Sequence, residues 1–263
     1  MAGGLKEMAL SEFPENLTSL HHQEEVLRAR ALEIIAANQG LLLQLQITEQ
    51  AMNVCDVFRQ HITDDEDLKV VQIMSIRMFN ALGTSLKLSL SGYSQTAALV
   101  MRDILETVFL VDLFAGEQLL ITAWRNAPKA ERWKHFKPAA VREALDKRDG
   151  FTSQKRRQAY DLFCDLAGHP NMTSHLMLRP APEADAVSGP FMSALTLEAV
   201  VSELGRLAVQ VGNCIVPFYP TDWQHGSAAR QQFARVCNMW MANFYPDAYA
   251  ARAAEVLQKH ASS

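Results

Sequence analysis

The chain has 263 residues, of which 49% are hydrophobic and 21% charged, and its formal net charge is −4. This composition excludes an intrinsically disordered chain, which combines low hydrophobicity with a high net charge. It also excludes a uniformly basic or acidic protein, so a charged binding surface would have to come from local clustering.

Cysteine spacing and the N-terminal sequence predict a cytoplasmic protein. The cysteines are far apart and form no close pair of the kind that zinc or redox motifs need, so we expect buried thiols; they are Cys55, Cys164, Cys214 and Cys237. The first residues lack the apolar core of a secretory signal. We find no run of about 18 apolar residues that would span a bilayer, and therefore expect no membrane contact.

The first half of the chain predicts long helices. Alanine and leucine make up about a quarter of all residues, which favours helix. Apolar residues recur every seven positions from Leu20, predicting one helix over residues 19–61 with a possible bend at Gly40. Thr63 and Glu66 form a capping-box pattern that starts a second helix. Residues 93–115 are apolar around most of a helical wheel and predict the central helix of a bundle.

The second half predicts shorter helices and one long loop. Pro138 opens a helix that runs to residue 148, and a helix over residues 153–167 should stop at Gly168. Three prolines and a glycine predict a loop over residues 179–190. Further helices are expected over residues 196–216, 227–244 and 247–260.

These elements predict an all-α fold, a helical bundle of about eight or nine helices in a single domain over residues 1–263. The loop at residues 179–190 is a possible internal boundary. It would separate a core bundle over residues 16–178 from C-terminal helices over residues 195–260.

A basic segment stands out between Arg125 and Arg157, with eleven bases against four acids. Interleaved aromatic residues could stack on bases while the cations neutralise phosphates, which predicts a nucleic-acid-binding face. The candidate binding residues are Arg132, Lys134, Lys137, Arg148, Lys155, Arg156 and Arg157. The alternative is a solvated connector whose cations pair with the acidic N-terminal third.

A second candidate site lies on the predicted central helix. Arg102 and Glu106 are four residues apart and therefore share one helical face, where they can pair. In an apolar helix such charges need a partner or a ligand. The alternative is a solvated stripe, because Gln95 and Asp103 fall on the same arc.

His169 follows the expected helix end at Gly168 and titrates near neutral pH. If it faces Arg102 and Glu106, the three residues could hold a phosphate or activate a water molecule; capping of helix carbonyls is the alternative role. A metal site is less favoured, because no HExxH-like spacing joins the possible ligands; these are Glu106, Asp165, His169 and His175. No phosphate loop or dinucleotide motif occurs, so we expect no cofactor.

The segment from Gly92 to Pro170 resembles a group of uncharacterised bacterial all-helical proteins. The shared pattern is Gly, an apolar stretch, Arg-x-x-x-Glu and then a Tyr before His-Pro, matched by Arg102, Glu106, Tyr160, His169 and Pro170. That group looks related to the HEPN superfamily, some members of which are ribonucleases. The resemblance implies a HEPN-like core, a homodimer and RNA as a partner. The spacing of Arg and His in catalytic members is not found in this sequence.

Three functions follow as hypotheses. The first is a dimeric HEPN-like module that binds RNA or a protein, in bacterial defence or stress. The second is a ribonuclease or other hydrolase that uses Arg102, Glu106, His169 and Tyr160. The third is a bundle that binds a small ligand in a pocket beside the Met- and aromatic-rich residues 236–246.

Overall fold

The computed structural model describes residues 14–170, 172 and 174–251, and in these residues the regular structure is helical, without strands. The predicted all-α class is confirmed. The α-helices are α1 (Glu15–Ala36), α2 (Gln39–Arg59), α3 (Glu66–Leu90), α4 (Ser94–Gly116), α5 (Leu119–Asn126), α6 (Lys129–Phe136), α7 (Pro138–Arg148), α8 (Lys155–Phe163), α9 (Ala194–Ile215) and α10 (Gln224–Phe244). Three short elements complete them: η2 (Cys164–Gly168), η3 (Ser174–Leu178) and η4 (Val216–Phe218).

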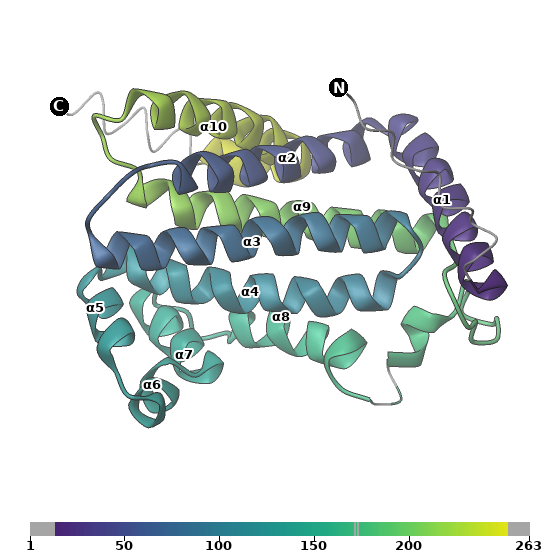
Figure 1. Cartoon of the computed structure of the whole chain (residues 1–263), viewed down its shortest axis with the longest axis horizontal. Coiled ribbons are helices and arrows are strands. Elements are labelled where there is room, and N and C mark those ends of the chain that lie inside the picture. Colours follow the sequence, from purple (N-terminus) through teal and green to yellow (C-terminus); the bar gives the residue numbers. More distant parts are fainter. Residues whose placement is uncertain (1–13, 171, 173, 252–263) are drawn as a thin grey trace, which may run out of the picture.

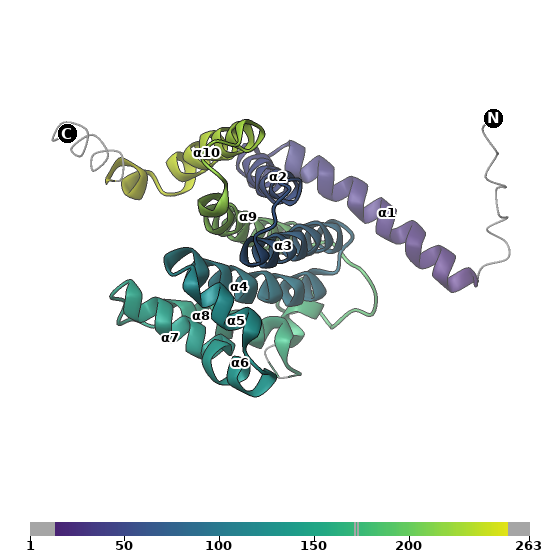
Figure 2. The ribbon, with the colours of Figure 1, turned by 60° about the vertical axis from the view of Figure 1, so that its left-hand side comes forward.

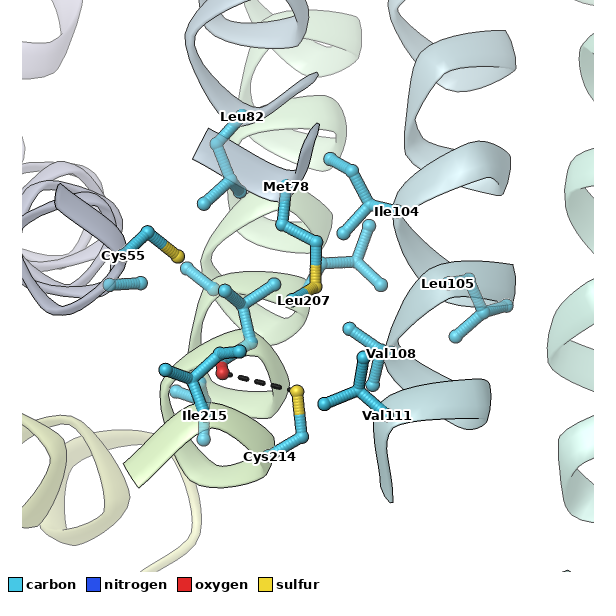
Figure 3. Packing of buried hydrophobic residues seen from close by; sticks show 14 of the residues in the cluster. Cys55, Met78, Leu82, Ile104, Leu105, Val108, Val111, Leu207, Cys214 and Ile215 are labelled. Atoms are coloured by element: carbon cyan, nitrogen blue, oxygen red, sulfur yellow. Dashed lines mark hydrogen bonds between the residues drawn. The ribbon is translucent and has the colours of Figure 1, made fainter. Parts of the chain in front are cut away.

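Four long helices, α2, α3, α4 and α9, run side by side and form the centre of the molecule (Figures 1 and 2). Each contributes a fully buried side chain to one hydrophobic core, for example Phe58, Met78, Ile104 and Leu207. Figure 3 shows Met78, Ile104 and Leu207 converging from three of these helices. The predicted central helix at residues 93–115 is therefore confirmed as α4, because burial on several sides requires apolar residues around most of its circumference.

The expectation of one helix over residues 19–61 is wrong. The chain breaks at Ala37 and Asn38, before Gly40, because the Asn38 side chain accepts a hydrogen bond from the Leu41 amide at 3.2 Å and starts α2 afresh. Helix α1 points away from the bundle (Figure 2). The Tyr93 hydroxyl tethers it by donating to Glu24 at 2.7 Å, and burial, together with this carboxylate, raises the pKa of Tyr93 to about 12.

The expected number of eight or nine helices is too low for the described part of the chain. The first predicted helix is two helices, and α5 and α6 are short helices in a stretch for which the sequence predicted none. The second helix does start in the predicted TDDED sequence, but Asp65, not Thr63, caps it by accepting from the Asp67 and Leu68 amides. Of the helix expected over residues 247–260, residues 247–251 are helical and the rest lie outside the described residues.

The loop at residues 179–190 does not separate two hydrophobic cores. Helix α9, which follows it, packs against α2, α3 and α4, and its buried Leu204 and Leu207 belong to the same core as Phe58 of α2. The buried Trp240 of α10 also donates to Gln44 of α2 at 2.6 Å.

One segment, Ala194–Phe218, is long and apolar enough to cross a membrane by length and composition, with a mean hydropathy of 1.3. The apolar pattern of the sequence had led us to expect no such segment. This is weak evidence for a membrane span, because 61% of the apolar 18-residue window in this segment is buried inside the bundle and the core helix of a soluble protein has the same features.

Candidate functional site

The Arg102–Glu106 pair forms on α4 as predicted. The guanidinium donates from Nε and Nη2 to Glu106 Oε1 at 3.3 and 3.2 Å. The two side chains are 24% and 28% exposed, so the pair lies at the edge of the core and not in full solvent. The neighbouring Asp103 turns toward α3 and pairs with Arg77.

Tyr160 of α8 joins this pair. Arg102 Cζ lies 5.2 Å from the centroid of the Tyr160 ring. Burial raises the pKa of Tyr160, as do the charge of Glu106 and hydrogen bonding to Cys164, so the phenol is neutral at physiological pH.

Arg142 of α7 is a member of this cluster that the sequence analysis missed. Its Cζ lies 4.0 Å from the same Tyr160 ring, and its Nη1 is buried without a hydrogen-bond partner. The only available signal was its place in the basic segment, which did not show that α7 packs against α4 and α8. Arg102, Glu106, Arg142 and Tyr160 are called the α4 cluster below.

His169 is next to the α4 cluster but does not join it. Gly168 packs against the Arg102 guanidinium, since a Cβ at Gly168 would lie 2.8 Å from Arg102 Nη1. The His169 amide donates to the Cys164 carbonyl at 3.2 Å and closes the turn, while its side chain is exposed. None of the described hydrogen bonds joins its imidazole to Arg102 or Glu106.

The possible metal ligands named from the sequence do not assemble. Among the described residues, no group of three or more His, Cys, Asp or Glu side chains is arranged to hold a metal ion.

A hollow of about 490 Å³ lies between α3, α4 and α5 to α7, and we call it the acidic hollow. Its α4 wall carries two carboxylates, Asp103 and Glu106, and its opposite wall carries the rings of Trp124, Trp133 and Phe136. Its size and its mix of aromatic and polar groups are those of small-molecule sites. The small-ligand hypothesis placed the pocket beside residues 236–246, which do not line this hollow.

A smaller hollow of about 250 Å³ adjoins it, and we call it the basic hollow. It shares with the acidic hollow the three aromatic rings and Pro138. Its charged residues are cations instead, Lys129, Arg132 and Lys137. Trp133, which is 68% exposed, borders both hollows.

Most arginines of the basic segment pair with carboxylates of the same chain. Arg148 pairs with Asp112 at 3.1 Å and with Asp149 at 2.7 Å. Arg156 pairs with Asp146 at 2.7 Å and also with Asp149. The partners are thus mainly local acids, although Arg125 does reach Asp67 near the N-terminus at 2.8 Å.

Two further arginines of the basic segment also have partners within the chain. Arg157 contacts Asp161 at 3.3 Å. Arg132 lies 4.8 Å from the Trp124 ring and donates to the carbonyls of Trp124 and Ala127 at 3.0 Å each, which fixes the turn between α5 and α6.

The lysines of the segment behave differently. These side chains are exposed, and in the part of the chain that the structure describes they form no ion pair; they are Lys129, Lys134, Lys137, Lys147 and Lys155. Three of these lysines lie on or directly after α6. The basic segment therefore contains one surface of free cations beside an exposed tryptophan.

Comparison of the chain with protein-family models, with curated proteins and with solved structures finds no match.

Proposed function

We propose that the chain binds single-stranded RNA at the α6 surface, which consists of Lys129, Trp133, Lys134, Phe136 and Lys137. The observation that carries this proposal is the position of Trp133, 68% exposed between the acidic hollow and the basic hollow. A nucleotide has the same two parts, a flat base and a charged phosphate.

The cations of the α6 surface are available to a ligand. No carboxylate neutralises Lys129, Lys134 or Lys137 within the described residues, and the one acid on α6, Glu131, lies 3.3 Å from His135. Phosphate groups that bind such lysines release condensed counterions, which favours binding at low salt.

The rings of the α6 surface provide the second component. A base stacks on an exposed aromatic ring irrespective of its sequence, and each stacked base adds about 1–3 kcal/mol. Of the two rings, Phe136 packs edge-on against the buried Phe114, with centroids 6.3 Å apart, and is therefore held by the core.

The resemblance of the segment from Gly92 to Pro170 to proteins related to the HEPN superfamily makes RNA the first nucleic acid to test. A HEPN-like core, a homodimer, cytoplasmic location and a role in bacterial defence or stress belong to the same proposal.

The hydrolase alternative receives less support from the geometry. Glu106 is engaged by Arg102 and Tyr160, and no described contact brings the His169 imidazole to it. The α4 cluster therefore lacks a base that is free to accept a proton.

The test is binding of the full chain to a short unstructured RNA, followed by tryptophan fluorescence and by anisotropy of a labelled RNA. We expect Trp133→Ala to weaken binding about ten-fold, since it removes one stacking platform. Phe151→Ala is the matched control. Phe151 is 50% exposed in the same basic segment, but Arg156 already covers its ring at 5.1 Å, so this change should leave affinity unaltered.

Equal loss in both variants, or no RNA binding by the unmodified chain at low salt, would refute the proposal. Single-stranded DNA of the same sequence serves as the second probe. If DNA bound more tightly than RNA, the α6 surface would remain the proposed binding site and single-stranded DNA would become its proposed ligand.

A further inference from the structure

We infer that the acidic hollow selects a base with an exocyclic amino group, which is present in cytosine, adenine and guanine and absent from uracil. This inference rests on the proposed function, since it assigns a base to the hollow beside the phosphate-binding lysines.

The two hollows differ in the charges that line them. Both are bounded by Trp124, Trp133 and Phe136. The carboxylates line only one hollow, together with Arg77, and the lysines Lys129 and Lys137 line only the other. Asp103 and Glu106 are paired with Arg77 and Arg102, whereas Lys129 and Lys137 form no ion pair in the described residues and attract a phosphate more strongly. A nucleotide on Trp133 therefore places its base, not its phosphate, in the acidic hollow.

The α4 wall of the acidic hollow offers hydrogen-bond acceptors to a ligand. Asp103 accepts from Arg77 through Oδ1, and in the described structure its Oδ2 has no partner. Glu106 accepts from Arg102 through Oε1 and is also engaged by the Tyr160 hydroxyl. The Thr107 hydroxyl donates its proton to the Asp103 carbonyl at 2.9 Å and so has only lone pairs left for a ligand.

The acceptors that remain on the α4 wall are therefore Asp103 Oδ2 and the Thr107 hydroxyl oxygen, and a ligand binds there best when it supplies a donor. The N4 amino group of cytosine supplies one, as do N6 of adenine and N1 with N2 of guanine. Uracil has N3–H as its only donor on this edge, and it carries a carbonyl oxygen at position 4, where cytosine carries the amino group. The donors among the lining side chains are Arg77, which is paired with Asp103, and the indoles of Trp124 and Trp133 on the opposite wall.

Oligo(C) and oligo(U) of equal length give the sharpest comparison. The two RNAs carry the same number of phosphates and bases of the same size. Cytosine has an amino group at position 4 and an acceptor at N3, whereas uracil has a carbonyl at position 4 and a donor at N3. We expect the full chain to bind oligo(C) about ten-fold more tightly, in line with the discrimination that one well-placed base contact gives.

Variants locate the origin of this ratio. Asp103→Asn replaces a carboxylate oxygen with an amide NH₂ that can donate to uracil O4, so the ratio should fall towards one; Glu106→Gln should act in the same direction. Glu143→Gln is the control, because Glu143 is an exposed carboxylate of α7 that does not line the hollow.

Each outcome is decisive. Equal binding of the two RNAs, or tighter binding of oligo(U), overturns the base preference and leaves the α6 surface as an RNA-binding site. A ratio that survives both Asp103→Asn and Glu106→Gln overturns the role of these carboxylates. Binding of neither RNA at low salt removes the proposed function itself.

Discussion

Two parts of one basic run of sequence have opposite electrostatic roles: the α6 surface, and the arginines Arg148, Arg156 and Arg157 of α7 and α8. On the α6 surface Lys129, Lys134 and Lys137 are free of ion pairs in the described structure. In the second region Arg148 and Arg156 are held by aspartates of α4, α7 and the turn that follows α7. The first region can attract an anion, and the second is already neutralised.

The difference follows from side-chain chemistry. A planar guanidinium presents several donors in a fixed geometry and binds two carboxylates at once, as Arg156 does with Asp146 and Asp149. A lysine ammonium is strongly hydrated and gains little from such an arrangement, so it stays in solvent. Counting positive charges in a sequence therefore overestimates a binding surface when the charges are arginines with aspartates nearby.

The largest expected effect is on RNA affinity. Replacing all three lysines of the α6 surface with glutamine should lower affinity about 50-fold at 0.15 M salt, because each single-strand phosphate contact contributes a slope of about 0.7 in a plot of log K against log [salt]. The slope itself should fall by about 2. Anisotropy titrations over a range of salt concentrations measure both quantities.

Replacing Arg148, Arg156 and Arg157 with glutamine is the matched triple variant, with the same change of charge. Provided that it remains folded by circular dichroism, it should keep the salt slope of the unmodified chain. If the salt slope fell more in the arginine variant than in the lysine variant, the binding face would have to be assigned to α7 and α8.

The next largest effect is on stability. Here we expect the arginine region, and not the α6 surface, to be the more sensitive of the two. Arg156 is only 14% exposed and bridges Asp146 and Asp149, so Arg156→Gln leaves both carboxylates without their shared partner. We expect a loss of about 2 kcal/mol in the free energy of unfolding. Urea denaturation measures it, with the exposed neighbour Lys155→Gln as control.

Lys155→Gln should change stability by less than about 0.5 kcal/mol. The contrast between the two regions would collapse if the two neighbouring variants were equally stable, because the bridge around Arg156 would then contribute nothing.

The sequence predicted the helices of the core well, because burial leaves a periodic pattern. Helix α4 is apolar around most of its surface, and it is in fact packed by α3, α9, α7 and α8. The break at Asn38 was missed for a local reason. An asparagine cap interrupts the chain without disturbing the heptad of apolar residues, which continues from α1 into α2.

The candidate site was only partly predictable. The i,i+4 spacing of Arg102 and Glu106 follows from helical geometry, and their pair formed. The approach of Arg142 and Tyr160 depends on how α7 and α8 fold back on α4, which no local pattern encodes. The aromatic residues of the basic segment were named, but which of them would be exposed was decided by tertiary packing.

The smallest expected effect is a pH dependence that separates the same two regions. Hydrogen bonds from Arg148, followed by those from Arg156, lower the pKa of Asp149 to about 2 from its ordinary value of 3.8. A carboxylate with a lowered pKa stabilises the folded state above its unfolded pKa and loses that contribution as the pH falls through the folded value.

The unmodified chain should therefore exceed Asp149→Asn in unfolding free energy by about 1 kcal/mol above pH 5, after allowance for solvent screening. The difference should shrink between about pH 4 and pH 2, as urea denaturation in a pH series can measure. The lysines of the α6 surface have no carboxylate partner in the described structure, so Lys134→Gln should show a difference that does not vary with pH. If the difference in unfolding free energy between the unmodified chain and Asp149→Asn did not depend on pH, Asp149 would not be held by the arginines. The ion pairs that distinguish the arginine region from the α6 surface would then be contradicted at this residue.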